Sequence, residues 1–211
     1  TPHITVCGVL WCLILPAGER LKLTIDLKLT LSCTLDRNYI SNGGIQLMAT
    51  DNVVMIICSG VGATLLTDVW ALFQKRILKI PGLNYALVGR WALWMADGRF
   101  CHQTIISSAA RKGETVTGWL IHYLSGALLA FIPLAITGEG WLQQPKISVA
   151  LASGIISLAA PFLLMQPALG FGIAASKTPN PPRARLLSLA THLVFGCGLY
   201  LTMYLLNCLF Y

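Results

Sequence analysis

Four long apolar stretches alternate with shorter polar segments along the chain. They cover approximately residues 53–73, 118–136, 147–170 and 186–206. Crossing the hydrocarbon core of a bilayer takes about 20 helical residues, and each stretch is close to that length. The pattern therefore predicts an all-α fold, an integral membrane bundle of four transmembrane helices.

A shorter apolar segment lies between the first two stretches. The sequence "NYALVGRWALWM", residues 84–95, mixes aromatic and aliphatic side chains around a single arginine. Such a segment favours a short helix in the membrane interface, with Trp91 and Trp94 at the level of the lipid headgroups. We expect this interfacial helix within the first polar connection of the bundle.

The first 47 residues do not follow this pattern. Residues 21–36 alternate apolar and polar side chains as a strand does, but a strand without a partner is marginally stable at best. The first methionine is Met48, and "SNGGIQLM" resembles a ribosome-binding sequence read as protein. We interpret residues 1–47 as an upstream or non-native extension, poorly ordered or strand-like, and residues 48–211 as the transmembrane domain. An extracytoplasmic extension behind an atypical signal is the alternative.

Composition supports a membrane location. Hydrophobic residues make up 55% of the chain and charged residues 11%, and the mean hydropathy is +0.69. Soluble domains carry about 25% charged residues, so an ordinary soluble domain is excluded and the lipid bilayer is the expected partner. The net charge of +7 does not indicate nucleic acid, because basic residues next to apolar spans commonly mark cytoplasmic loops.

The basic residues are distributed unevenly among the connections. Residues 74–116 hold seven Lys and Arg, residues 171–185 hold three, and residues 137–146 hold Lys146 alone. Because cytoplasmic loops are enriched in Lys and Arg, the first and third connections are predicted to be cytoplasmic. Both chain ends are then extracytoplasmic, which agrees with an even number of crossings.

Several ordered motifs resemble a known family. These are "GVGATLLTDVWALFQKR", "YALVGRW", "GRFCHQTI", "GWLIHYLSG", "MQPALGFGIAASKTP" and "SLATHLVFGCGLY". Together they resemble a family of bacterial multi-pass membrane proteins of unknown function, over about residues 53–206. The resemblance implies a multi-pass protein of the bacterial inner (cytoplasmic) membrane. It implies no reaction and no catalytic residues.

Each predicted helix carries one polar residue near its cytoplasmic end: Asp68, His122, Gln166 and His192. At a rise of 1.5 Å per residue, all four lie roughly 6 to 10 Å below the cytoplasmic surface. Polar groups inside a membrane are costly and commonly face the bundle interior, so we predict a shared ligand or proton site in which Asp68 pairs with His122 or His192. Alternatively, each group reaches interfacial water or a neighbouring helix separately.

The third stretch contains Pro161 and Pro167 and ends in glycines. Residues 147–175 would span about 43 Å as a continuous helix, against a hydrocarbon core of roughly 30 Å, so a tilt or a break is expected. Pro167 removes the hydrogen bond to the Leu163 carbonyl and frees an acceptor near Gln166. Gly170 and Gly172 favour close backbone packing or a turn at the membrane surface.

Arg99 and His102 lie in the first cytoplasmic connection, in "DGRFCHQT". Arg99 could bind a phosphate or lipid headgroup, pair with Asp97, or be solvated at the surface. The histidines His102, His122 and His192 could ligate a metal or haem, but no metal-type spacing accompanies them. The metal content is therefore undetermined, and no cofactor is predicted.

Two functional classes follow, and enzymatic activity is the less favoured of them. The first is a small transporter or ligand-handling membrane protein for an unknown small molecule or ion. Four helices enclose little volume, which favours a homo-oligomer. The second is a membrane redox or metal/haem-binding enzyme that uses the three histidines. In a third reading, the polar layer is structural and the protein is an assembly subunit.

Overall fold

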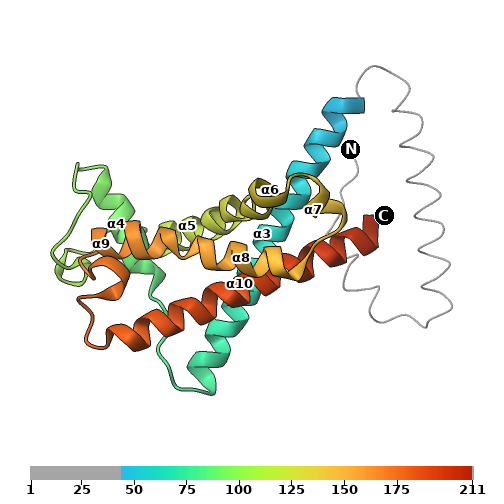
Figure 1. Cartoon of the computed structure of the whole chain (residues 1–211). Helices are drawn as coiled ribbons and strands as arrows, with labels where there is room; N and C mark the ends of the chain where they lie inside the picture. The colour runs from blue at the N-terminus through green and yellow to red at the C-terminus, as the bar shows by residue number, and fades with distance from the viewer. Residues whose placement is uncertain (1–43, 211) are drawn as a thin grey trace. The chain divides into compact units, whose positions relative to one another are not determined.

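The structure is a computed structural model that describes residues 44–210 (Figure 1). The described residues fall into two units, 44–51 with Phe210, and Asn52–Leu209. The predicted strand at 21–36, like most of the predicted extension, lies outside the described residues. The description below concerns the second unit.

Every regular element among residues 44–210 is helical, which confirms the predicted fold class. In chain order the elements are α3 (Gly44–Arg76), α4 (Tyr85–Met95), η1 (Ile105–Ser107), α5 (Glu114–Leu129), α6 (Ile132–Thr137), α7 (Gly140–Gln143), α8 (Ile147–Ser157), η2 (Ala160–Met165), α9 (Gln166–Ala168), η3 (Ile173–Ala175) and α10 (Pro181–Phe210).

Four helical stretches are long and apolar enough to cross a membrane. They are Asp51–Arg76 in α3, Glu114–Thr137 in α5 and α6, Ile147–Ala168 from α8 to α9, and Pro181–Phe210 in α10. Each contains most of one predicted stretch, and three of the four extend beyond the prediction at both ends. The predicted short helix is α4, which begins at Tyr85 after Asn84 accepts a hydrogen bond from the Ala86 backbone at 3.1 Å.

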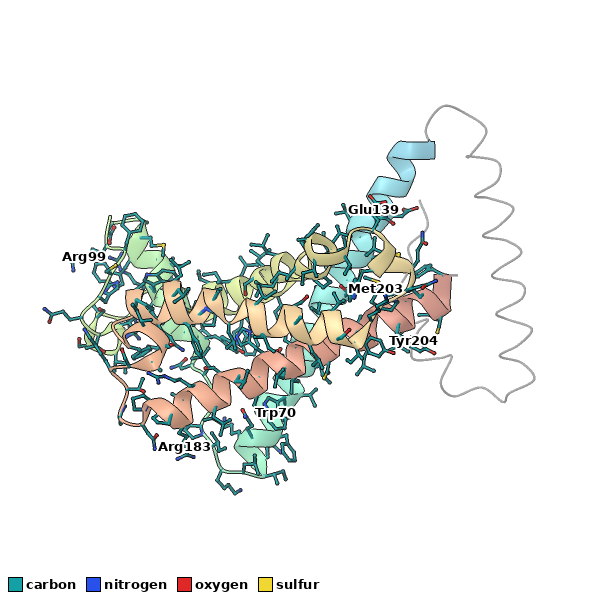
Figure 2. All side chains as sticks on the ribbon, in the orientation of Figure 1. Trp70, Arg99, Glu139, Arg183, Met203 and Tyr204 are labelled. Carbon is teal, nitrogen blue, oxygen red and sulfur yellow. The ribbon has the colours of Figure 1, made fainter. Side chains whose placement is uncertain are left out.

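The two basic connections meet at one end of the unit. The backbone N–H of His102 donates to the Ala168 carbonyl at 2.8 Å, and that of Ile105 donates to the Leu169 carbonyl at 3.0 Å. Figure 2 shows Arg99 and Arg183 towards this end and Glu139 towards the other. The segments 74–116 and 171–185 therefore lie at the same end of the bundle, as four crossings require.

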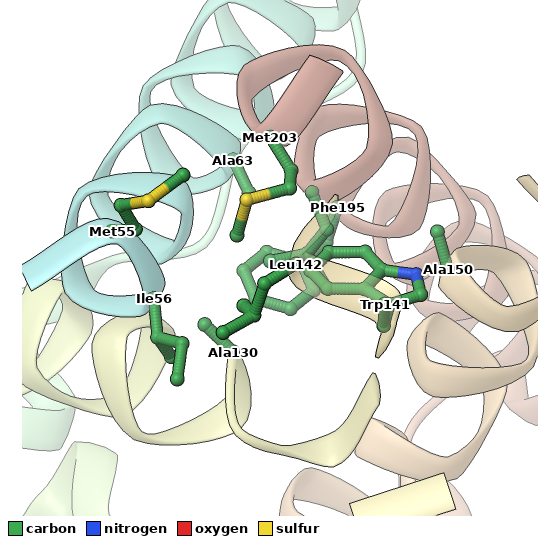
Figure 3. Close-up of a cluster of buried hydrophobic side chains, with 10 residues drawn as sticks. Met55, Ile56, Ala63, Ala130, Trp141, Leu142, Ala150, Phe195 and Met203 are labelled. Carbon is green, nitrogen blue, oxygen red and sulfur yellow. The ribbon is translucent and has the colours of Figure 1, made fainter. Parts of the chain in front are cut away.

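A cluster of buried apolar side chains joins the helices towards the opposite end (Figure 3). Its members are Met55, Ile56, Ala63, Ala130, Trp141, Leu142, Ala150, Phe195, Leu199 and Met203. Three of these are alanines, so helix backbones approach closely around the larger side chains. Among apolar helices in lipid, such van der Waals packing is a main source of association.

Glycines make several of the helix crossings possible. A Cβ atom on Gly60 of α3 would lie 2.7 Å from the carbonyl oxygen of Gly126 in α5, and one on Gly198 of α10 would lie 2.6 Å from the Ala63 Cα in α3. A Cβ atom on Gly154 of α8 would lie 2.3 Å from the His192 carbonyl oxygen in α10. These distances are shorter than non-bonded contacts allow, so the crossings require glycine.

The third membrane stretch is interrupted, as its length predicts. Regular α-helix ends at Ser157, and residues 160–165 form a π-helical turn in which the Gln166 N–H donates to the Pro161 carbonyl. Pro161 has no N–H to donate to the preceding turn, which explains why the ladder changes there. Pro167 lies inside α9, after the interruption.

The same stretch ends in a glycine turn. Gly170 has a φ of 89°, and its N–H donates to the Pro167 carbonyl while the Phe171 N–H donates to the Gln166 carbonyl. This is the Schellman arrangement, which satisfies the last carbonyls of a helix. Gly172, with a φ of 75°, continues the turn, and a Cβ atom on Gly170 would lie 2.1 Å from the Gln103 carbonyl oxygen, so the glycines provide both a turn and close backbone packing.

Helix α4 packs against the beginning of α5. A Cβ atom on Gly89 would lie 1.8 Å from the Glu114 carbonyl oxygen, so the two backbones touch. Arg90 donates two hydrogen bonds to the Glu114 carboxylate, at 2.8 and 2.9 Å, and these bonds raise the pKa of the guanidinium further. The two-point contact fixes the orientation of α4 relative to α5.

We predict that Gly154→Ala lowers the free energy of unfolding by about 1–3 kcal/mol, because the added methyl group forces α8 away from α10. Reversible unfolding in mixed micelles measures this. Gly140→Ala is the control, since a Cβ atom there meets no atom within 4 Å, and its effect should stay within about 0.5 kcal/mol. Equal effects of the two substitutions would contradict the close crossing.

Candidate functional site

A cavity of about 410 Å³ lies among α3, α4, α5, η2 and α10, next to residues 80–83. Small-molecule sites have volumes of roughly 300–1,000 Å³ and mostly apolar walls with a few polar groups. The walls here are mostly apolar and include Val88, Ile121, Leu129, Leu164 and Phe195. The cavity therefore has the size and the character of a ligand site.

Three of the four predicted site residues line this cavity. His122 comes from α5, Gln166 from the start of α9, and His192 from α10. The fourth, Asp68 of α3, does not line the cavity, but it is hydrogen-bonded to His122. The polar groups that the sequence places at one depth on four helices thus converge around one space.

The Asp68 carboxylate is bound by two side chains of α5. The His122 Nε2 atom lies 3.0 Å from Oδ1, and the Tyr123 hydroxyl donates to Oδ2 at 2.8 Å. The side chains of Asp68 and His122 are 21% and 15% exposed. Both carboxylate oxygens have a partner, as a carboxylate in an apolar helix requires. Of the two alternatives, His122 and not His192 is the partner of Asp68.

Tyr85 connects α4 to this pair. Its ring stacks on the His122 ring with centroids 4.2 Å apart, and it also lines the cavity. Burial and the nearby Asp68 carboxylate raise the pKa of Tyr85, so its hydroxyl stays protonated at physiological pH. Sequence reasoning did not single out Tyr85, although its place at the start of the predicted short helix next to a membrane span was a usable signal.

His192 is oriented by a serine of the neighbouring helix. The His192 Nδ1 atom lies 2.6 Å from the Ser157 Oγ atom, and that hydroxyl donates its own proton to the Gly154 carbonyl at 2.6 Å. Since the serine proton is already used, Nδ1 must be the donor to Ser157. The Nε2 atom of a neutral His192 then carries the lone pair and can accept a hydrogen bond.

Two glutamines on the cavity wall carry buried polar atoms with no partner in the protein. These are Gln74 Nε2, a donor, and Gln166 Oε1, an acceptor. The Gln74 residue is only 7% exposed. Leaving such an atom unpaired costs about 1–3 kcal/mol, so the cavity is suited to a polar occupant. Gln74 was missed because it lies at the basic end of the first helix, where a polar residue is unremarkable in sequence.

Comparison with protein families gives one match. The family model described as "Protein of unknown function (DUF2938)" matches residues 56–206. The chain belongs to this family. No curated protein and no solved structure matches it. The motifs that suggested a family of unknown function lie almost wholly within the matched residues, so that recognition is confirmed. The cavity-lining residues of this family member all lie within the match.

The predicted supporting residues lie outside the cavity wall. The Arg99 guanidinium lies 4.8 Å from the centre of the Trp94 ring, and Asp97 pairs with Arg111 instead of with Arg99. The His102 Nδ1 atom lies 3.0 Å from the Ser108 hydroxyl. Pro167 is within α9 and is not part of the wall.

The two tryptophans of α4 are also tied to the protein. The Trp91 indole N–H donates to the Phe100 carbonyl at 2.8 Å, and that of Trp94 donates to the Ala109 carbonyl at 3.2 Å. Their N–H groups are therefore used within the protein, and the headgroup contact of these rings stays a prediction.

The histidines do not form a shared metal site in the described part of the chain. Among residues 44–210, no group of three or more His, Cys, Asp or Glu side chains is placed to hold a metal ion. His122 is paired with Asp68, His192 with Ser157 and His102 with Ser108. Each histidine thus has a separate protein partner.

We predict that Asp68→Asn and His122→Gln are coupled by about 0.5–3 kcal/mol in a double-mutant cycle, because the two side chains share a hydrogen bond. Asp68→Asn and His192→Gln should be additive within about 0.3–0.5 kcal/mol. Unfolding of the three single variants, the two double variants and the wild type in mixed micelles measures both cycles. Stronger coupling of Asp68 to His192 than to His122 would contradict the geometry.

Proposed function

We propose that this protein is a multi-pass protein of the bacterial inner membrane that binds or transports a small molecule. The site is the cavity among α3, α4, α5, η2 and α10. His122, Gln166 and His192 are its polar contacts, and Asp68 orients His122 from behind. The loops 74–116 and 171–185 face the cytoplasm, which puts the site in the cytoplasmic leaflet.

One observation carries this proposal: a mostly apolar cavity holds buried polar atoms that the protein itself does not satisfy. The interior of a structural bundle normally pairs its buried polar groups. The Gln74 and Gln166 atoms without partners favour a space that is occupied by water or ligand in the working protein. A ligand-handling role is thus favoured over a purely structural one.

The π-helical turn beside the cavity also supports ligand handling. Its residues 160–165 and the following Gln166 contribute much of one wall. Single π-helical turns are frequent at functional sites, and interrupted membrane helices recur at transporter binding sites. The interruption at Pro161 therefore fits a binding role better than a passive kink.

Cysteine labelling tests the proposal. In a protein whose seven native cysteines are replaced by serine, Thr191→Cys should react with a membrane-impermeant maleimide added from the cytoplasmic side. Thr191 lines the cavity, so water in the cavity supports the reactive thiolate. Labelling in inside-out and right-side-out vesicles identifies the side of access.

Leu124→Cys is the matched control. Leu124 and Thr191 each lie ten residues after the first residue of their helices, Glu114 and Pro181, and both helices begin at the same end. Leu124 is 59% exposed on the bundle and is outside the cavity wall, so in a membrane it should face lipid and stay unreactive. If Thr191→Cys is as unreactive as Leu124→Cys, the cavity is closed to the cytoplasm and the proposal fails.

A further inference from the structure

We infer that the cavity selects amphipathic amines, molecules with an apolar body and one protonated amino group, over anionic molecules of the same shape. This inference rests on the proposed function, because it names the ligand class of the same site. Three features of the wall carry it: hydrogen-bond acceptors without a donor in the protein, the sign of the nearby charge, and the apolar and aromatic surface around them.

Two hydrogen-bond acceptors on the wall have no donor in the protein. Gln166 Oε1 is buried without a partner, and the Nε2 atom of neutral His192 is an acceptor because Nδ1 donates to Ser157. The Gln74 Nε2 atom is the opposing donor. A ligand group with several N–H donors, such as an ammonium, matches two acceptors from facing helices.

Four hydroxyl groups of the wall also offer acceptors. The protons of Thr64, Thr67, Ser125 and Thr191 are donated to backbone carbonyls of their own helices, at 2.7 to 3.0 Å. These hydroxyls therefore present oxygen lone pairs to the cavity. The Tyr85 and Ser188 hydroxyls and the Gln74 amide are donors on the same wall, but they are neutral and so do not offset the charge of a carboxylate.

The charged groups near the cavity also favour a cationic ligand over an anionic one. Within residues 52–209, no Lys or Arg side chain contributes to the wall, while Asp68 lies directly behind His122 at 3.0 Å. With a neutral His122 the local charge is negative, and with a protonated His122 it is zero. In neither state is the net local charge positive, so nothing favours an anion, whereas a cation is attracted or tolerated.

The apolar part of the wall has room for a hydrocarbon body. Tyr85 and Trp91 place aromatic rings on the wall, beside Leu83, Val88 and Leu164. Aromatic faces attract a desolvated cation electrostatically, and they also pack against apolar groups. An amine with an alkyl or aryl tail satisfies both parts of the wall.

Three probes with the same body and different polar ends test the inference: 4-phenylbutylamine, 4-phenylbutanol and 4-phenylbutyrate. Each is titrated against maleimide labelling of the Thr191→Cys protein in micelles at pH 7. A protein that retains only Cys101, exposed and outside the cavity wall, provides the reference rate. The amine should protect Thr191→Cys at a concentration at least about tenfold below the carboxylate, with the alcohol between them.

A wall substitution provides the matched variant. In the Thr191→Cys protein, Gln166→Met removes one acceptor at similar size, so protection by the amine should weaken about 2- to 10-fold, the range for one hydrogen bond. Protection by butylbenzene, a hydrocarbon with the same body and no polar end, should not change. If Gln166→Met fails to fold, the three-probe series alone decides.

The possible results separate the inference from the proposed function. Equal or better protection by 4-phenylbutyrate overturns the amine preference, while the ligand-handling role stands. Protection by the alcohol and hydrocarbon alone also overturns it, because the charge and the donors would then contribute nothing. An unreactive Thr191→Cys thiol overturns the proposed function and the inference together.

Discussion

The hydrogen-bonded carboxylate of Asp68 is the constraint on which the site depends. A carboxylate in an apolar helix needs partners for both oxygens, because lipid offers none. His122 and Tyr123, adjacent on α5, bind one oxygen each and so hold α3 and α5 in one register. The same bond turns the His122 ring towards the cavity and against Tyr85 of α4. One costly side chain thereby positions groups from three helices.

The site also depends on the close approach of the helices at glycine residues. Side-chain hydrogen bonds of about 3 Å between helices require backbones that lie close together. Gly154 lets α8 approach the His192 carbonyl, and Ser157, one turn further along, then reaches the His192 ring at 2.6 Å. Gly60 and Gly126 bring α3 against α5 in the same way. Small residues at helix contacts are typical of membrane bundles, and here they also set the geometry of the polar pairs.

Much of this architecture could be predicted from the sequence. The features that could not be predicted depend on how the helices pack. The four spans and α4 follow from lengths and apolar runs, which reflect the thickness of a bilayer. The layer of Asp68, His122, Gln166 and His192 follows from a rise of 1.5 Å per residue. The identity of the residue that pairs with Asp68 does not follow from the sequence, because it depends on how α3 and α5 are rotated about their axes. Gln74 and Tyr85 lie at helix ends, where polarity is ordinary, so only the packing of α3 and α4 reveals their place on the cavity wall.

The π-helical turn explains how an apolar helix presents Gln166 to the cavity. Pro161 lacks the N–H that would continue the α-helical ladder, and the Gln166 N–H reaches back five residues to the Pro161 carbonyl. A turn of this kind holds one residue more than an α-helical turn, so it changes which of the following residues face inward. Gln166 is the first residue after the turn, and its side chain lies on the wall. Of the two prolines in this stretch, Pro167 follows the interruption, and Pro161 is the one at which the hydrogen-bond ladder changes.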